Sequence, residues 1–187
     1  MFELKRQTVH LFFGAILSVA ALYLSKDQFL SIILFLLVFS KMISDMMLSG
    51  KPVPFLRSFF RLFEREKDMK KLPGGGLIFF LLGAFLSRSL FSGFESAVGI
   101  LILAVSDAAA TVIGTNFGKS KLPWNKRKTF EGSISFFFTS FFIFYPFISP
   151  RFSLLGALIL AFLESSDFLD DNFLIPVIAA LIMRLFS

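Results

Sequence analysis

Apolar runs separated by short polar segments fill the sequence from one end to the other. The chain is 56% apolar and contains 29 Phe, whereas soluble domains average about 45–50% apolar residues. The runs cover residues 10–24, 29–43, 77–91, 96–114, 134–148, 152–164 and 173–186. This pattern predicts an all-α membrane protein, a polytopic bundle of about seven transmembrane helices in a single integral membrane domain over residues 1–187.

Several of these runs are shorter than the roughly 20 residues that cross a bilayer unaided. Either polar flanking residues lie deep in the interface, or the bilayer is thin around the protein. The first run also has the length of a secretory signal, with Ser18-Val19-Ala20 as a cleavage site. We favour a membrane span because further apolar runs follow it.

The longest polar segment, residues 45–72, mixes charged residues with Phe. Phe55, Phe59 and Phe60 recur between Arg residues at roughly helical spacing. This pattern predicts an amphipathic interfacial helix. Pro73 and three glycines then break the backbone before the next apolar run.

Positive charge is distributed unevenly between the two sides of such a bundle. The segments 45–72 and 115–133, together with Lys5 and Arg6, carry fourteen Lys and Arg residues, and the opposite loops carry four. Cytoplasmic loops are enriched in Lys and Arg. We therefore expect a cytoplasmic N-terminus in the cytoplasmic membrane, with loops at about 45–72, 115–133 and 165–172, and all the candidate chemistry, on the cytoplasmic face.

The amino-acid composition excludes several kinds of catalytic and metal sites. Cys is absent and His10 is the single histidine, which excludes disulfides, thiolate catalysis, Cys-based or His-cluster zinc sites and Ser-His-Asp triads. The net charge of +6 comes from residues between apolar runs. This placement favours anionic lipid headgroups and phosphates over nucleic acid as partners.

The stretch 106–133 concentrates the candidate chemistry. Asp107 lies near the end of an apolar run, and an ionisable side chain in a span is a functional candidate by default. Ala110 and Gly114 follow at i+3 and i+7 and share its helix face. Asp107 is suited to bind Mg²⁺, which prefers one or two carboxylates plus substrate phosphates. The alternative is a structural carboxylate that caps the helix or pairs with a basic residue.

Glycines and basic residues come next. Gly114 and Gly118 are candidates to expose backbone N–H groups to phosphate, although their spacing is not that of a P-loop. The basic residues are Lys119, Lys121, Lys126, Arg127 and Lys128. They fit either a phosphate site or an ordinary positive-inside cluster, and Lys128 is the best candidate because it begins Lys-Thr-x-Glu-Gly-Ser. Glu131 and Ser133 in that motif either cap the next span or, for Glu131, add a metal ligand.

An acidic cluster ends the sixth apolar run. It comprises Glu164, Asp167, Asp170, Asp171 and Asn172. Carboxylates unmatched by nearby cations repel each other unless a cation or a proton lies between them, so the cluster predicts a metal site or, alternatively, a solvated acidic turn. Glu164 and Asp171 share one face if the helix continues. His10, near the cytoplasmic mouth, is either structural or a phosphate contact.

These residues resemble three elements of the CTP-dependent lipid kinases, which include dolichol kinase, phytol kinase and the CTP-using diacylglycerol kinase. The central element reads Asp107-x-x-Ala110…Gly114-x-x-Phe117-Gly118-Lys119-x-Lys121-Leu122-Pro123-Trp124-Asn125-x-x-Lys128-Thr129-x-Glu131-Gly132-Ser133. The opening and closing elements read Glu3-x-Lys5-Arg6-x-x-x-His10 and Glu164…Asp170-Asp171-Asn172-x-x-x-Pro176. They stand in the family's order and cover nearly the whole chain.

Two positions depart from the family pattern. Ser106 replaces the usual Gly before the Asp, and Ser165-Ser166 stand where a small residue and Pro are common. Neither change removes a charged group. The wider superfamily includes phosphatidate cytidylyltransferase, but the chain lacks the His-Gly-Gly…Asp-Arg-x-Asp ending typical of that enzyme, which favours a kinase.

The resemblance implies that the hydroxyl of a membrane lipid alcohol, of polyprenol, phytol or diacylglycerol type, attacks the γ-phosphate of CTP and releases CDP, with Mg²⁺ as cofactor. The implied catalytic residues are Asp107, Lys128 and Glu131. The implied metal ligands are Asp107, Glu164, Asp170 and Asp171. The implied nucleotide-binding residues are Arg6, His10, Gly114, Gly118, Lys119, Lys121, Asn125, Lys128, Thr129 and Ser133.

Two other functions fit parts of this pattern. A cytidylyltransferase would let a lipid phosphate attack the α-phosphate of CTP. A small transporter or scaffold would explain Asp107 as an ion or proton site, but not the Lys-Thr-x-Glu-Gly-Ser segment. A homodimer would help to bury so small a bundle.

Overall fold

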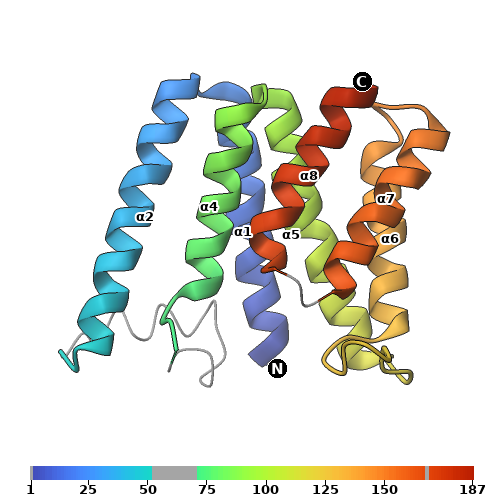
Figure 1. Cartoon of the computed structure of the whole chain (residues 1–187), viewed down its shortest axis with the longest axis horizontal. Helices are drawn as coiled ribbons and strands as arrows, with labels where there is room; N and C mark the ends of the chain where they lie inside the picture. The colour runs from blue at the N-terminus through green and yellow to red at the C-terminus, as the bar shows by residue number, and fades with distance from the viewer. Residues whose placement is uncertain (1, 52–70, 167–168) are drawn as a thin grey trace.

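The computed structural model describes residues 2–51, 71–166 and 169–187, and these parts of the chain fold into helices without a strand (Figure 1). The helices are α1 (Phe2–Tyr23), α2 (Lys26–Leu48), α4 (Gly75–Leu90), α5 (Gly93–Asn116), α6 (Phe130–Phe144), α7 (Pro150–Ser165) and α8 (Asp171–Phe186). Each coincides with one predicted apolar run, so the prediction of an all-α chain is confirmed. Residues 52–70 of the predicted interfacial helix lie outside the described residues, and 45–48 continue α2.

The helix ends differ from the predicted runs for local reasons. α1 begins at Phe2 instead of residue 10, because polar residues are compatible with a helix outside the apolar core. α2 begins earlier than expected because Ser25 and Gln28 form a capping box. α6 ends at Phe144, four residues before the predicted end. Pro146 lies two residues further on and cannot donate the backbone hydrogen bond that a continuing helix requires.

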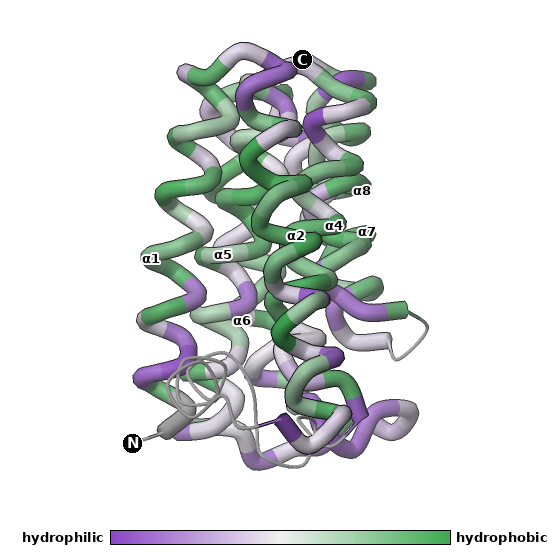
Figure 2. Tube along the Cα trace, turned by 90° about the vertical axis from the view of Figure 1, so that its left-hand side faces the viewer, coloured by the Kyte–Doolittle hydropathy of each residue, from purple (hydrophilic) through white to green (hydrophobic). Residues whose placement is uncertain are grey.

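The outside of the bundle is apolar. Phe35 of α2 and Phe142 of α6, for example, are 68% and 65% exposed. Figure 2 shows hydrophobic residues along the body of the bundle and hydrophilic ones gathered at its ends. Apolar exposure on this scale suits contact with lipid rather than water.

Two helices in the described ranges, α2 and α5, are long and apolar enough to cross a membrane, and α4 and α6 are shorter apolar helices. By length and composition, these helices suit a membrane protein.

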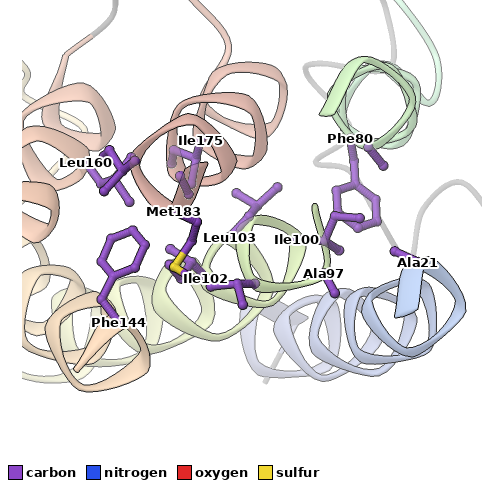
Figure 3. Close-up of a cluster of buried hydrophobic side chains, with 14 of the residues drawn as sticks. Ala21, Phe80, Ala97, Ile100, Ile102, Leu103, Phe144, Leu160, Ile175 and Met183 are labelled. Carbon is purple, nitrogen blue, oxygen red and sulfur yellow. The ribbon is translucent and has the colours of Figure 1, made fainter. Parts of the chain in front are cut away.

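Helix α5 forms the centre and packs against α1, α6 and α8. Its Ile100, Ile102 and Leu103 are fully buried and belong to the cluster drawn in Figure 3. Small residues allow the backbones to approach. A Cβ on Gly14 of α1 would collide with Ala104 of α5, and one on Gly99 with the carbonyl oxygen of α8 at Pro176. Close contacts of this kind hold helices together in lipid, where the hydrophobic effect between helices is absent.

Successive helices run in alternating directions, so the connections gather at two ends (Figure 1). The start of α1, the loop 117–129, the end of α7 and the start of α8 lie toward one end, which we call the loop end. The turns at 24–25, 91–92 and 145–149 and the C-terminus lie at the other, which we call the turn end. The predicted site residues from α1, α5, α7 and α8 are thereby brought to the loop end.

Candidate active site

The loop end contains a cavity of about 910 Å³ whose walls come from six helices and the loop 117–129. Its volume lies within the range of small-molecule sites. Most of the predicted site residues line it, namely Arg6, His10, Asp107, Gly114, Gly118, Lys121, Asn125, Lys128, Thr129, Ser133, Glu164, Asp170 and Asp171. The shared face predicted for Asp107, Ala110 and Gly114 is confirmed, since all three line this cavity.

Lys128 lies between two carboxylates at the cavity wall. Its Nζ donates to Oε1 of Glu164 at 2.7 Å and to Oδ2 of Asp171 at 2.9 Å. The hydroxyl of Ser133 donates to the second oxygen of Glu164 at 3.0 Å. The side chain of Glu164 is only 2% exposed, so its charge depends on these partners.

This arrangement corrects two points about the acidic cluster. The cluster has a matching cation, Lys128, which stands 36 and 43 residues away in the sequence from Glu164 and Asp171. The helix does not continue between the two carboxylates, because α7 ends at Ser165 and α8 begins at Asp171. They meet at Lys128 from two different helices. Asp167 lies outside the described residues.

The charges around Lys128 keep it protonated. Burial alone would lower the pKa of its ammonium group, but Asp171, Glu164 and Asp107 outweigh burial and raise that pKa well above its ordinary value. Lys128 is therefore a fixed positive charge. An ammonium group has three N–H donors, and the two ion pairs leave one of them for a ligand.

Asp170 begins α8. Its Oδ1 accepts a hydrogen bond from the backbone N–H of Asn172 at 3.0 Å, as an N-cap does. Burial and the neighbouring charge of Asp171 raise the pKa of Asp170 to about 6. A carboxylate in such surroundings gains from a nearby cation.

Two polar groups in the cavity wall make no hydrogen bond or ion pair with the described residues. The carboxylate of Asp107 makes no hydrogen bond or ion pair there, and the buried Nε2 of His10 makes no hydrogen bond. The ring of His10 lies 5.2 Å from that of Phe80 on α4. Buried polar atoms are nearly always paired, so Nε2 of His10 is available to a ligand. The carboxylate of Asp107, which is partly exposed to the cavity, is available as well.

The glycines have a packing role in the wall. Thr129 caps α6 by accepting a hydrogen bond from the N–H of Gly132 at 3.1 Å. A Cβ on Gly114 would lie 2.9 Å from the Thr129 hydroxyl, and one on Gly118 would collide with the carbonyl oxygen of Gly114. Glycine at both positions lets the end of α5 contact the start of α6. Phosphate binding by their N–H groups stays a prediction.

Glu131 and Lys119 are the predicted site residues that do not line the cavity. Glu131 Oε1 accepts hydrogen bonds from the backbone N–H groups of Lys119 at 3.0 Å and Ser120 at 3.2 Å. It fastens the loop 117–129 to the first turn of α6. This placement gives Glu131 a structural role close to the capping alternative. The catalytic role implied by the resemblance stays a prediction.

Asn125 lines the cavity but also holds the loop. Its side chain is buried, its Nδ2 donates to the carbonyl oxygen of Ser165 at 3.2 Å, and its Oδ1 accepts from the N–H of Arg127 at 3.0 Å. These bonds attach the loop to the end of α7.

The sequence patterns missed one whole wall of the cavity. It is formed by the start of α4 and the residues before it, namely Lys71, Leu72, Gly75, Gly76, Leu77, Phe79 and Phe80. Arg127 and Asn172 also line the cavity. The sequence signal nearest to this wall was Pro-Gly-Gly-Gly after a basic segment. From the sequence it predicted only a break in the backbone before the next apolar run, and not a cavity wall.

The donor set suits Mg²⁺ that arrives with a nucleotide. No group of three or more His, Asp and Glu side chains in the described ranges is arranged to hold a metal by itself. Asp107, Asp170 and Asp171 nevertheless line one cavity. Mg²⁺ typically takes one or two protein carboxylates and completes its shell with phosphates and water, so these residues fit that mode of binding.

Comparisons with known proteins agree with these features. The chain is 32% identical over 188 residues to an uncharacterized protein of Methanocaldococcus jannaschii, covering 98% of this chain and 94% of that protein. It is 27% identical over 154 residues to CTP-dependent diacylglycerol kinase 1 of Schizosaccharomyces pombe, covering 68% of this chain and 70% of the kinase. Over 82 residues it is 39% identical to the chloroplastic phytol kinase 1 of Arabidopsis thaliana, covering 42% of this chain and 26% of that protein.

No family model and no solved structure matches the chain. The matches to curated proteins nevertheless cover between 42% and 98% of the chain in the three comparisons above. The chain belongs to the CTP-dependent lipid kinase family, whose members include a phytol kinase and CTP-dependent diacylglycerol kinases.

Proposed function

We propose that this protein is a kinase that transfers the γ-phosphoryl group of CTP to the hydroxyl of a membrane lipid alcohol and releases CDP. The observation that carries the proposal is one cavity in a membrane protein whose walls combine Lys121, Arg127 and Lys128 with Asp107 and Asp171. The names of the related kinases supply CTP and the class of acceptor.

Phosphoryl transfer requires positioning and charge stabilisation more than covalent help from the protein. Lys121, Arg127 and the remaining N–H of Lys128 are placed to bind phosphate oxygens, and such donors stabilise charge that develops on those oxygens. Glu164 and Ser133 fix Lys128 so that it is in position before the nucleotide binds.

Asp107, Asp170 and Asp171 would hold Mg²⁺ together with the nucleotide phosphates. The bound cation would neutralise phosphate charge. Asp107 makes no hydrogen bond or ion pair with the described residues, which is consistent with this role, because no such contact has to be broken when the cation binds.

We place the loop end on the cytoplasmic face, with the seven described helices crossing the membrane. α6, α7 and α8 have 15 or 16 residues and are about 24 Å long, shorter than the roughly 30 Å hydrocarbon core. The mouth of the cavity then lies at headgroup level. A lipid alcohol and a cytosolic nucleotide can both reach that depth.

Product analysis tests the proposal. Purified protein receives Mg²⁺, CTP labelled in its γ-phosphate, and polyprenol, phytol or diacylglycerol. We expect label in the lipid, release of CDP, and loss of both when EDTA removes the metal. Release of labelled pyrophosphate when phosphatidate is supplied would instead support a cytidylyltransferase. Absence of transfer to every alcohol would contradict the proposal.

A further inference from the structure

The wall of the cavity formed by α4 is chemically unlike the ionic wall. It presents Leu77, Phe79 and Phe80, preceded by Gly75 and Gly76. The side chains of Leu77, Phe79 and Phe80 offer no charge and no hydrogen bond to a triphosphate. They match an alkyl chain.

The cavity is closed on the side of the bundle core. Phe80 stacks in a tilted arrangement against His10, with ring centres 5.2 Å apart and an angle of 52°. Just beyond them α1 and α5 are in contact at Gly14 and Ala104. Further along, the core is filled by buried residues such as Ile100, and Figure 3 shows Phe80 pointing from α4 towards them. An alkyl chain in the cavity therefore cannot continue along the bundle axis.

α1 and α4 pack only weakly against each other, so a route from the cavity into the bilayer would pass between these two helices. α1 packs mainly along α5, whereas α4 packs against α8 and α2. The ring contact between His10 and Phe80 joins the two helices at the cavity floor. An alkyl chain that leaves the cavity between α1 and α4 would contact Phe80.

His10 lies where the apolar wall meets the ionic one. Its ring contacts Phe80, its buried Nε2 has no hydrogen-bond partner among the described residues, and Asp107 of the ionic wall lines the same cavity. A hydroxyl at this point gains a hydrogen bond while its carbon chain remains against α4.

We propose that one corner of the cavity is the acceptor site for a long-chain primary alcohol. This corner, which we call the α4 corner, consists of His10, Leu77, Phe79 and Phe80. The hydroxyl of the alcohol is hydrogen-bonded to Nε2 of His10, and Phe80 limits the branching that the site admits next to the hydroxyl carbon. The identity of the acceptor rests on the proposed function, whereas the position of the corner rests on the cavity itself.

Photo-crosslinking tests the position without turnover. A geranylgeraniol analogue with a diazirine near its hydroxyl is irradiated with the protein in nanodiscs, without CTP, and the labelled residues are identified by mass spectrometry. We expect labelling of Leu77, Phe79 or Phe80 that excess geranylgeraniol suppresses, whereas labelling of outward-facing Phe35 is not suppressed. Suppressible labelling confined to other sites would overturn the proposal.

Kinetics of substituted proteins test the two specific roles. His10→Phe keeps the ring contact but removes the hydrogen bond, and we expect the KM for the alcohol to rise about tenfold with the KM for CTP unchanged. His10→Gln, which returns a polar group near the position of Nε2, should recover part of the loss. Equal effects on both substrates, or none, would contradict the assignment of His10.

Phe80→Ala should raise kcat/KM for diacylglycerol, which branches next to its CH₂OH group, relative to geranylgeraniol. Phe35→Ala is the matched control and should leave the ratio unchanged. An unchanged ratio in Phe80→Ala would contradict the role of Phe80. If the native protein transfers no phosphate to any alcohol, the proposed function fails, while the crosslinking result still decides whether the corner binds an alcohol.

Discussion

The two ends of the bundle use polar residues for opposite purposes. At the turn end, Ser25 and Ser92 each form a capping box that closes a tight turn. Glu95 completes the second box and lies 3.5 Å from Arg184. At the loop end, polar residues instead surround an open volume of about 910 Å³.

The difference lies in how many polar groups remain available to a ligand. The carboxylate of Glu95 is already engaged by a backbone N–H and by Arg184. At the loop end Asp107 and Nε2 of His10 have no such partner among the described residues, and Lys128 keeps one N–H donor unused. The turn end stabilises the fold, and the loop end retains binding capacity at some cost in stability.

Of the substitutions that compare the two ends, removal of the Lys128 ammonium group should have the largest effect. Lys128→Ala leaves Glu164 and Asp171 without their cation, and we expect a loss of about 3–5 kcal/mol in the free energy of unfolding together with loss of phosphate transfer. Thermal unfolding in detergent and the label-transfer assay measure the two effects. Lys26→Ala at the turn end removes an exposed hydrogen bond to the carbonyl oxygen of Ser89 and should cost less than about 1 kcal/mol. Similar effects of the two substitutions would contradict the assignment.

A second comparison of the two ends uses one tightly packed glycine from each, Gly118 at the loop end and Gly93 at the turn end. A Cβ on Gly118 would collide with Gly114, and one on Gly93 would lie 2.5 Å from the carbonyl oxygen of Ala21. Each change to Ala should destabilise the protein by about 1–3 kcal/mol, as overpacking does. Only Gly118→Ala should also lower kcat per folded molecule, because it moves the loop 117–129. Equal kcat values for the two variants would show that the loop does not position the site.

Glu131→Gln should have the smallest effect. Gln keeps an oxygen that can accept from the N–H groups of Lys119 and Ser120, so we expect a stability change of about 1 kcal/mol or less and nearly unchanged kcat. Steady-state kinetics with a saturating alcohol measure it. A loss of two orders of magnitude or more in kcat, with the fold intact, would instead support the catalytic role that the resemblance implies for Glu131.

The sequence was a good guide to the helices and to residues that lie close together in the chain. Apolar runs locate every described helix, and helical spacing correctly places Asp107, Ala110 and Gly114 on one face. Contacts between distant segments were not predictable. The pairing of Lys128 with Glu164 and Asp171 depends on how α6, α7 and α8 pack, so the sequence showed carboxylates without a cation.

The apolar wall was missed for a different reason. Phe80 and Phe35 both occupy apolar runs of a Phe-rich chain, and hydropathy is the same whether a side chain faces lipid or a cavity. Only the packing shows that Phe80 is buried at the cavity floor and that Phe35 is exposed on the outer surface.

The most direct test compares Asp107→Asn with Glu95→Gln in the γ-phosphate transfer assay, with thermal unfolding measured on the same samples. The account predicts that Asp107→Asn unfolds at nearly the native temperature, because its carboxylate makes no hydrogen bond or ion pair with the described residues. It also predicts that the variant transfers phosphate at least about 100-fold more slowly, the scale of losing one electrostatic contact to a transition state. Glu95→Gln should unfold at a lower temperature and transfer phosphate at nearly the native rate. A folded Asp107→Asn protein with native transfer would contradict the central claim that the loop end is the active site.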